Sequence, residues 1–354
     1  MSTFGDASER VVPVDVDAAA AARAHHDRLT KPPGSLGRLE DVGVQLSAIA
    51  RQCPPPVPEP ATVAVFAADH GVLAEGISPW PQEVTAQMVA NFGAGGAAVN
   101  VLARHVGAQV VVIDVGVATE LPEVPGLRRA KVRAGTDNLA KGPAMTRAEA
   151  EAALEVGAVL AAELVDGGAR CLLTGDMGIG NTTPSAALIA VLCGRRPAEV
   201  TGRGTGIDDE RMARKVEIVA NAVARAAAER ASRPLDLLAS IGGLEIAALA
   251  GYIVGGAAAR VPVLLDGVIA AAGAVVAVAM VPDSVGYLVA GHRSTEPGAT
   301  AALEHLGLVP LLDLDLRLGE GTGACLALPV LQGAARVLRE MATFDSAGVN
   351  EGPA

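Results

Sequence analysis

Aromatic side chains are scarce in this 354-residue chain: they make up only 2% of it, although 51% of the residues are hydrophobic. We therefore expect a flat ligand to be gripped by aliphatic side chains and Met rather than by aromatic stacking. Ala, Val, Leu and Gly dominate the apolar content, and such small residues allow helices to pack closely against a sheet. The length suits one large domain, with or without a smaller appendage.

Positive charge is also scarce. Lys and Arg number 28 against 39 Asp and Glu, the net charge is −11, and the cations form no basic run. Because binding nucleic-acid phosphates requires clustered cations, we expect no nucleic-acid partner. The four cysteines, Cys53, Cys171, Cys193 and Cys325, are far apart and include no CxxC pair. They are typical of core residues in a reducing compartment, not of a disulfide framework or a metal cage.

The sequence offers no membrane anchor. Its longest apolar stretch, 268–281, is too short to cross a bilayer and predicts a buried helix. The first residues, MSTFGD, place an acid before any apolar run, which is not typical of a signal peptide. We therefore expect a cytoplasmic protein with no membrane partner. Residues 1–14 have no periodicity and predict a loose leader.

Short β-branched runs alternate with Ala-rich segments from residue 61 onward. We expect strands at 62–67, 109–114, 170–174, 261–265, 284–290 and 309–314. These runs are nearly continuous in apolar residues, as strands covered on both faces should be. The alternation predicts a doubly wound α/β fold with a mostly parallel sheet. Helical spacing predicts further helices at 18–29, 36–51 and 323–338, and we expect the last to pack beside the first two.

Glycines and short polar residues follow each predicted strand. These loops lie at 69–71, 114–116, 175–183, 266–267, 291–298 and 318–323. In an open α/β sheet the ligand binds in the crevice at the carboxyl ends of the strands. We therefore predict one composite site built from all six loops.

The loop GIGNTT at 178–183 has the features of a phosphate-binding turn. Its glycines let backbone N–H groups face a ligand, and the helix that begins around Pro184 adds partial positive charge. An ordinary Gly-rich turn with a Thr cap explains the same residues, so this segment alone leaves both interpretations open. The chain has no GxxxxGK[ST] loop and no GxGxxG turn in its first βα unit, which disfavours those nucleotide-binding classes.

A second Gly-rich loop, at 202–206, also precedes a helix. The acids at 208–210 belong in the first turn of that helix, where negative charge is favourable. Lys215 follows two turns later and could reach an anion, although most such lysines face solvent.

Two carboxylates are candidates for acid–base chemistry. Glu320 stands between Gly319 and Gly321, before a predicted helix, where a ligand can approach closely. It is either a general base or an acid placed to favour the helix start. Asp176, at the end of another predicted strand, poses the same choice.

The six histidines form no metal-binding motif. His70 and His292 are better candidates for orienting loops than for acid–base roles, and we expect His25 and His26 to be solvated. Because the sequence has no HExxH or comparable cluster, we predict no metal and no other cofactor.

Five segments form a distinctive set: KPPGSLG (31–37), ADHGV (68–72), GDMGIGNTT (175–183), GHRS (291–294) and GEGTG (319–323). Together they closely resemble the nicotinate-nucleotide–dimethylbenzimidazole phosphoribosyltransferase family. The resemblance implies transfer of phosphoribose from nicotinate mononucleotide to 5,6-dimethylbenzimidazole. The products would be α-ribazole 5′-phosphate and nicotinate, and the reaction would serve cobalamin nucleotide-loop assembly.

The same resemblance implies a homodimer and two domains in each chain. The large α/β domain would span 61–322, and a small helical domain would combine 1–60 with 323–354. Glu320 would be the general base that takes the benzimidazole N–H proton, while the other ring nitrogen attacks C1′ of the ribose.

The resemblance also implies substrate contacts. Ser78, Gln87, Met177 and Leu318 would line the base pocket, and Gly178, Gly180, Asn181, Thr182, Lys215 and Ser294 would hold the ribose phosphate. Asp176 and Asp266 would face the same crevice. Asp176 stands where members of the family carry Glu, and its shorter arm changes the reach of the carboxylate.

Apart from the resemblance, the sequence leaves two other classes of protein to consider. A dinucleotide-dependent oxidoreductase would need a fingerprint in the first βα unit, and AADHG at 67–71 is not one. A non-catalytic binding protein that keeps the phosphate loop is the second. Binding measured with and without turnover separates both from a transferase.

Overall fold

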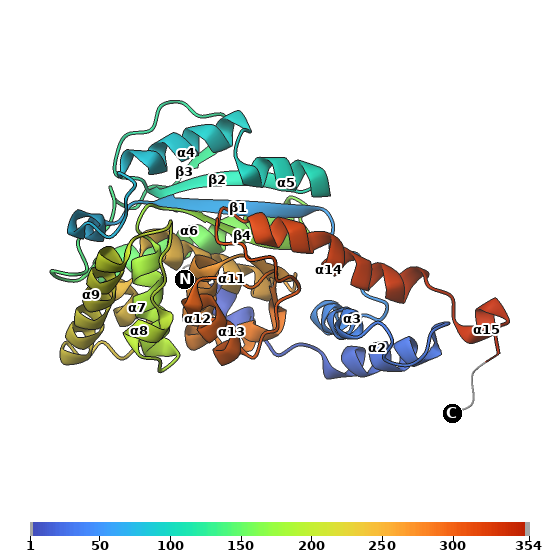
Figure 1. Ribbon diagram of the computed structural model, residues 1–354. Helices are drawn as coiled ribbons and strands as arrows, with labels where there is room; N and C mark the ends of the chain where they lie inside the picture. The colour runs from blue at the N-terminus through green and yellow to red at the C-terminus, as the bar shows by residue number, and fades with distance from the viewer. Residues whose placement is uncertain (1–2, 351–354) are drawn as a thin grey trace.

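The computed structural model describes residues 3–350 and has a six-stranded, all-parallel sheet in the order β3-β2-β1-β4-β5-β6 (Figure 1). The strands are β1 (Ala61–Ala68), β2 (Gln109–Gly116), β3 (Leu127–Arg129), β4 (Cys171–Met177), β5 (Val263–Leu265) and β6 (Leu288–Ala290). The winding direction reverses between β1 and β4, which is where a doubly wound sheet opens its ligand crevice. The predicted fold class is confirmed.

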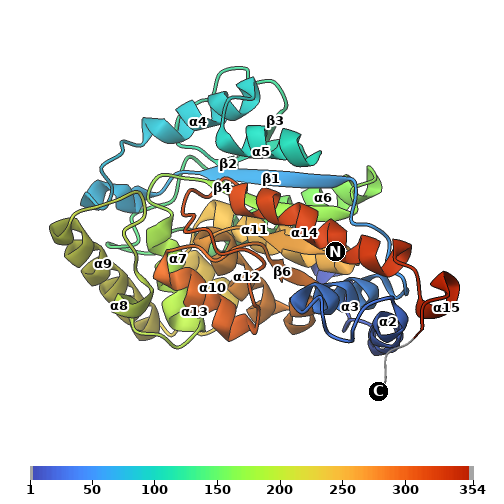
Figure 2. The same ribbon diagram turned by 45° about the vertical axis from the view of Figure 1, so that its right-hand side comes forward.

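Helices cover both faces of the sheet (Figures 1 and 2). One face packs against α4 (Glu83–Ala94), α5 (Ala98–Val106) and α14 (Thr322–Glu340). The other packs against α11 (Leu244–Ala258) and α12 (Val268–Met280), with α6 (Arg147–Asp166) and α7 (Thr182–Leu192) on their outer sides. The remaining helices are α1 (Thr3–Arg10), α2 (Val16–Arg28), α3 (Arg38–Ala50), η1 (Gly71–Glu75), α8 (Pro197–Val200), α9 (Asp209–Ala228), α10 (Pro234–Ile241), η2 (Pro282–Tyr287), α13 (Pro297–Leu306) and α15 (Phe344–Ala347).

Small residues allow the helices to pack at backbone distance. A Cβ added at Gly157 of α6 would lie 1.8 Å from the carbonyl oxygen of Ala248, and one at Gly251 of α11 would lie 1.9 Å from that of Leu154. No side chain fits at either position. The Ala- and Gly-rich composition therefore follows from the close approach of α6 and α11.

A small group of helices extends away from the sheet (Figure 1). It contains α2, α3 and the far end of α14, which share a small core of Ala22, Val44 and Leu338. The C-terminal helix therefore packs beside the N-terminal helices, as predicted. Because α14 also contacts β4 and β5, one continuous helix joins this group to the sheet.

Three predictions about elements are wrong. Residues 3–10 are not a loose leader but form α1, whose first backbone N–H groups, at Thr3 and Phe4, donate to the Glu155 carboxylate at 2.7 and 2.9 Å. Residues 309–314 form no strand, although Leu312 makes an isolated bridge to His292. Of the predicted strand 284–290, only the last three residues are β6, because η2 occupies the rest.

The histidine pair on α2 also differs from expectation. His26 is buried, with 2% of its surface exposed, and burial lowers its pKa. His25 makes a 2.9 Å hydrogen bond to the Leu338 carbonyl oxygen. His25 therefore joins α2 to α14, and His26 is packed beside Gly43 of α3, so neither side chain simply faces solvent.

The apolar stretch 268–281 forms the buried α12, as predicted. Across residues 3–350, no helix has the combination of length and apolar character needed to cross a membrane.

Candidate active site

The loops that follow β1, β4, β5 and β6 meet around a cavity of about 370 Å³. The predicted site residues that line it are Asp176, Met177, Gly178, Asn181, Thr182, Ser294, Leu318 and Glu320. The residues at 176–182 lie more than a hundred positions before Ser294, Leu318 and Glu320, and the parallel sheet brings them to one edge.

A smaller hollow of about 50 Å³ adjoins this cavity. Ser78, Gly180 and Lys215 line it, together with the Gly178–Thr182 segment that it shares with the main cavity. The site therefore has two connected lobes, one larger and mostly apolar, the other small and lined by a lysine.

The small lobe is built around the start of α7. Gly180 has a φ of +93°, a left-handed conformation that turns the chain into the helix at Thr182. Lys215 is 1% exposed, and its Nζ donates to Thr182 Oγ1 at 2.7 Å and to the Gly202 carbonyl oxygen at 2.9 Å. Burial lowers its pKa to about 8, against the opposing effect of Glu296. Lys215 therefore does not face solvent but lies against both Gly-rich loops.

The loop 202–206 is held by two residues that the sequence did not single out. Glu296 is 6% exposed, and its Oε1 accepts a 2.7 Å hydrogen bond from the Gly204 N–H. Arg317 donates to the Gly204 carbonyl oxygen at 3.0 Å. Both line the main cavity. These contacts join segments 92 and 113 residues apart, so no local motif could have revealed them.

Glu320 lies in the main lobe with only 6% of its surface exposed. Its φ is +65°, and its Oε2 accepts a 3.3 Å hydrogen bond from the Val99 N–H in the first turn of α5. Burial raises its pKa, and the charge of Asp266 adds to this. Because α14 begins only at Thr322, Glu320 precedes that helix and its carboxylate serves a different one. Glu320 is therefore not an acid in the first turn of α14, and its role as a general base stays a prediction.

Asp176 is the second buried carboxylate of the cavity, 5% exposed. Its Oδ2 accepts a 2.9 Å hydrogen bond from Asn181 Nδ2, while Oδ1 has no hydrogen-bond partner among the described residues. Burial raises its pKa well above the usual range, and the nearby charge of Asp266 acts in the same direction. A ligand donor is the natural partner for the free oxygen.

Asp266 is buried at the end of β5, but its carboxylate is directed at backbone. It accepts hydrogen bonds from the N–H groups of Gly321, Gly323 and Ala324 at 3.0, 2.8 and 3.2 Å. His292 Nε2 lies 3.5 Å from Asp266 Oδ1. Burial opposes the charged form of His292, but Asp266 outweighs it and the pKa is raised. A direct substrate contact of Asp266 stays a prediction.

His70 supports the loop that follows β1. It is buried, and its Nε2 lies 2.7 Å from Glu245 Oε1 of α11. Burial disfavours its charged form, yet the Glu245 carboxylate raises the pKa overall. His70 also lies directly against the loop 178–183, since a Cβ at Gly178 would be 3.3 Å from its Nε2. This placement fits the predicted loop-orienting role.

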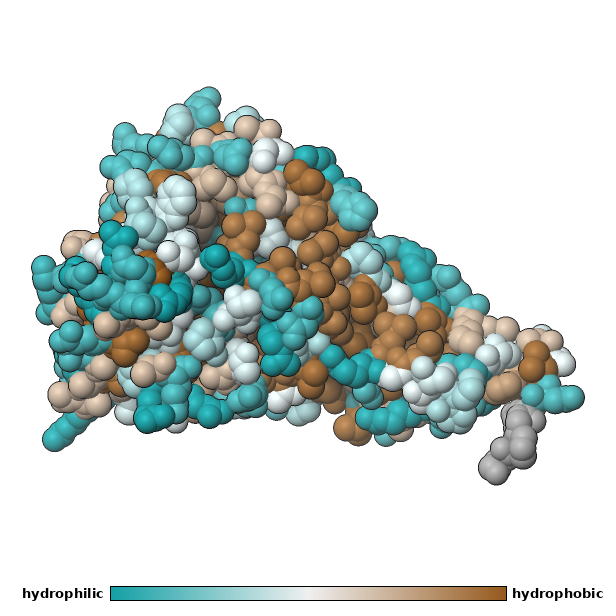
Figure 3. All heavy atoms as spheres, viewed as in Figure 1, coloured by the Kyte–Doolittle hydropathy of each residue, from teal (hydrophilic) through white to brown (hydrophobic). Residues whose placement is uncertain are grey.

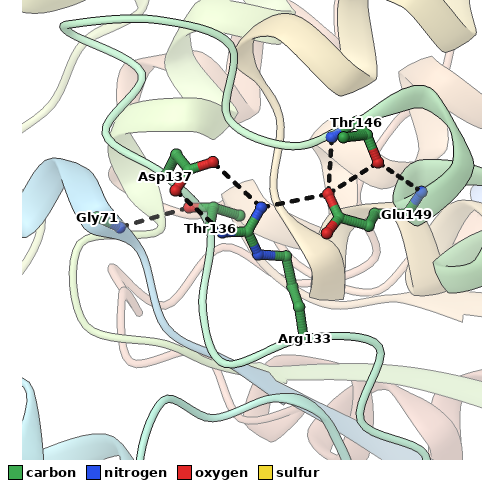
Figure 4. Close-up of polar contacts among 6 residues, drawn as sticks. All are labelled: Gly71, Arg133, Thr136, Asp137, Thr146 and Glu149. Atoms are coloured by element: carbon green, nitrogen blue, oxygen red, sulfur yellow. Dashed lines mark hydrogen bonds and ion pairs between the residues drawn. The ribbon is translucent and has the colours of Figure 1, made fainter.

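The loop that follows β1 is also held by contacts among Gly71, Thr136 and Arg133 and their partners (Figure 4). Gly71 N–H donates to the carbonyl oxygen of Thr136 at 3.1 Å. Arg133 then ties this segment to α6 by contacts of 2.9 Å to Asp137 and 3.2 Å to Glu149. The edge of the site nearest β1 is therefore firmly connected to the body of the protein.

Two predicted site residues, Gln87 and Asp266, line neither lobe. The side chain of Gln87 is exposed on α4. Trp80, Val84 and Met88 line the main lobe instead. No motif marked them, because an apolar side chain at the start of a helix has the same pattern whether it lines a cavity or a core. Val84 and Met88 give the lobe an aliphatic and thioether surface, but Trp80 adds an aromatic ring, which the expectation of a purely aliphatic and Met grip did not include.

Within residues 3–350, no group of three or more His, Cys, Asp or Glu side chains is placed to hold a metal ion.

Comparisons with known proteins agree with this geometry. A family model described as phosphoribosyltransferase matches residues 11–349. A nicotinate-nucleotide–dimethylbenzimidazole phosphoribosyltransferase from Salinispora tropica is 60% identical over 351 residues, which cover 95% of this chain and 96% of the relative. One of the same name from Chloroflexus aggregans is 51% identical and covers 99% of both chains.

Solved structures give the same result. The crystal structure of CobT from Thermus thermophilus superposes with a TM-score of 0.92 at 52% sequence identity, covering 95% of this chain and 100% of that one. The resemblance inferred from the five sequence segments is thereby confirmed. This chain belongs to the nicotinate-nucleotide–dimethylbenzimidazole phosphoribosyltransferase family.

Proposed function

We propose that this protein transfers phosphoribose from nicotinate mononucleotide to 5,6-dimethylbenzimidazole, forming α-ribazole 5′-phosphate and nicotinate for cobalamin assembly. The observation that carries the proposal is the pairing of two lobes in one site. A buried carboxylate, Glu320, lies in an apolar lobe large enough for a flat base, and Lys215 lies in the adjoining lobe at the start of α7. The names of the relatives supply the substrates.

In this proposal the small lobe holds the phosphate. Backbone N–H groups of the Gly178–Thr182 segment, the N-terminus of α7 and the Lys215 ammonium all favour an anion there. Asn181 and Ser294 extend from the same region into the main lobe, where the ribose would lie. The phosphate would then fix C1′ between the two lobes.

The main lobe would hold the benzimidazole, and the transfer would take place there. Glu320 accepts the N–H proton of the benzimidazole, the other ring nitrogen forms a bond to C1′, and the C1′–nitrogen bond of the nicotinate breaks. The electron pair of that bond neutralises the pyridinium nitrogen, so nicotinate leaves without its own proton. Proton removal by a placed base contributes roughly 10²- to 10⁴-fold, and holding two substrates in line contributes further.

The same chemistry explains why we propose no metal or cofactor. The leaving nitrogen already carries positive charge, so departure creates no anion that a Lewis acid would need to stabilise. Turnover should therefore survive exhaustive chelation. Loss of activity with EDTA and its restoration by a divalent ion would show that the mechanism lacks a component.

We also propose a homodimer that works in the cytoplasm. Figure 3 shows apolar side chains gathered on the face over α5, α14 and α3. Exposed apolar residues of α5 and of the segment that precedes α14 include Val101, Val309, Leu314 and Leu318, each between 52% and 60% exposed. An apolar surface of this kind is typical of a protein interface. The four free cysteines fit a reducing compartment.

The test is incubation with nicotinate mononucleotide and a panel of benzimidazoles, purines and phenols, with products identified by mass. We expect a ribosyl phosphate adduct of dimethylbenzimidazole and one equivalent of nicotinate. Nucleotide binding by calorimetry without any product would instead support the non-catalytic alternative.

A further inference from the structure

We propose that Asp266 is a positioning residue that holds Glu320 in place for proton transfer, and not a group that contacts the substrate. The inference rests on the proposed transfer reaction. It starts from the orientation of the Asp266 carboxylate. Residues 267–269 line the main lobe, whereas both carboxylate oxygens of Asp266 accept hydrogen bonds from backbone at 321–324.

These contacts replace a missing helix cap. The residue at the N-cap position of α14 is Gly321, which has no side chain to accept the free N–H groups of the first turn. Asp266 supplies the acceptor from a different element: Oδ2 serves Gly321, and Oδ1 serves Gly323 and Ala324. A carboxylate at this position also has the favourable sign for a helix N-terminus. The start of α14 is therefore fixed to the end of β5.

Glu320 needs this support because its backbone is not in a favoured conformation. Gly319, Glu320 and Gly321 have φ values of +84°, +65° and +101°. A non-glycine residue in this region persists only where its surroundings hold it. The hydrogen bond from Gly321 N–H to Asp266 begins one residue after Glu320, so it constrains the turn directly.

Asp266 is itself anchored from the sheet. Its backbone N–H donates to Thr174 Oγ1 of β4 at 2.9 Å. The hydroxyl of Thr174 is 3.4 Å from the Leu264 carbonyl oxygen, to which it donates. A connected path of hydrogen bonds thus runs from β4 and β5 to the turn that carries Glu320.

The charge of Asp266 gives this role a measurable signature. The charged or titratable side chains nearest the Glu320 turn are Asp176 from β4, Asp266 after β5 and His292 after β6, while α5 offers the Val99 N–H. Glu296 and Arg317 line the same lobe. Burial raises the pKa of Glu320, and Asp266 raises it further. Removing the Asp266 charge should therefore lower the pKa of Glu320 and move the acid limb of the kcat/KM profile to lower pH.

The decisive variant is Asp266→Asn, which keeps the shape but sets an NH₂ group against one of the backbone donors. We expect kcat to fall by at least about 10-fold, because small misplacements of a reacting group are costly, with the nucleotide Kd unchanged and the acid limb shifted as above. Asp15→Asn is the matched control. Asp15 caps α2 by accepting from Ala18 N–H at 2.8 Å, far from the site, and this variant should keep the wild-type kcat and profile.

A weaker nucleotide Kd with normal kcat would overturn the inference and return Asp266 to the substrate-contacting residues. A normal kcat with an unshifted pH profile of kcat/KM would also overturn it, because Asp266 would then only cap α14. If Asp266→Asn does not fold, Thr174→Val and Thr174→Ser decide: the first should lower kcat and the second should retain it, and equal values would overturn the inference. Absence of transfer by the wild-type protein would instead reject the proposed function.

Discussion

At the scale of single residues, Glu320 is where two interpretations differ most: a general base, or an acid that only favours a helix start. Glu320→Gln keeps the shape of the side chain and loses its ability to accept a proton. We expect kcat to fall by roughly 10² or more, with the nucleotide Kd nearly unchanged, since a base acts mainly in the transition state. Glu340→Gln, at an exposed end of α14, is the control. A near-normal kcat for Glu320→Gln would make Asp176 the next carboxylate to test.

Lys215 gives a second prediction at this scale. Its pKa is lowered to about 8, so its positive charge is lost as the pH rises through that value. The nucleotide Kd should therefore increase on the alkaline side of pH 8, because the phosphate loses its cationic partner. Lys215→Gln should bind weakly and lack this pH dependence. Titration calorimetry at several pH values checks both points, and a wild-type Kd that is flat across this range would place the phosphate elsewhere.

Sequence reasoning found the site residues that a local pattern marks and missed those whose role depends on a contact with a distant segment. Glu320 was recognisable because glycines flank it. Asp176 was recognisable because it stands in a Gly-rich segment at the end of a predicted strand. Glu296 was not, because its role depends on a hydrogen bond to Gly204 that no local pattern contains. His26 was misjudged for the same reason: it is buried beside Gly43 of α3, and the pattern of one helix cannot show what packs on it.

At the scale of elements, the turn into α7 is the clearest target. Gly180→Val would place a branched side chain at a φ of +93°, next to the space proposed for the phosphate. We expect the nucleotide Kd to rise by about 10-fold or more, with a loss of stability of about 1–3 kcal/mol from the strained backbone.

Gly194→Val separates these two effects. Gly194 also has a positive φ, of +64°, and has open space around its Cβ position just after the end of α7. It should lose similar stability while the nucleotide Kd stays at the wild-type value. If both variants bound the nucleotide normally, the loop 202–206 would become the preferred phosphate site.

The long, strongly patterned elements were predictable, and the short or irregular ones were not. The strands β1, β2 and β4 have apolar runs that sheet burial requires. The β3 strand has only three residues, Leu127–Arg129, two of them exposed arginines. The segment 309–314 has an apolar run like a strand, but it pairs with the chain after β6 through only a few hydrogen bonds. For α1, the stabilising contact lies about 150 residues away, at Glu155.

At the scale of the whole molecule, the exposed apolar face predicts self-association. Light scattering at micromolar concentration should report twice the mass of the 35.5 kDa chain. Val101→Glu, which puts a charge on the exposed surface of α5, should increase the monomer fraction, whereas Val101→Ile should not. A monomer mass for the wild-type protein would count against the dimer, and an unchanged mass for Val101→Glu would place the interface on another face.

The left-handed turn at Glu320 has a consequence for how this protein could be stabilised. A non-glycine residue at a φ of +65° costs about 1–3 kcal/mol, of which the flexibility of a glycine would return a part. Glu320→Gly should therefore give a protein that unfolds at a higher temperature and no longer transfers phosphoribose. Selection for heat resistance alone would favour the loss of this residue. With Glu320 as the proposed base, its presence in a segment otherwise made of glycine and threonine trades stability for activity.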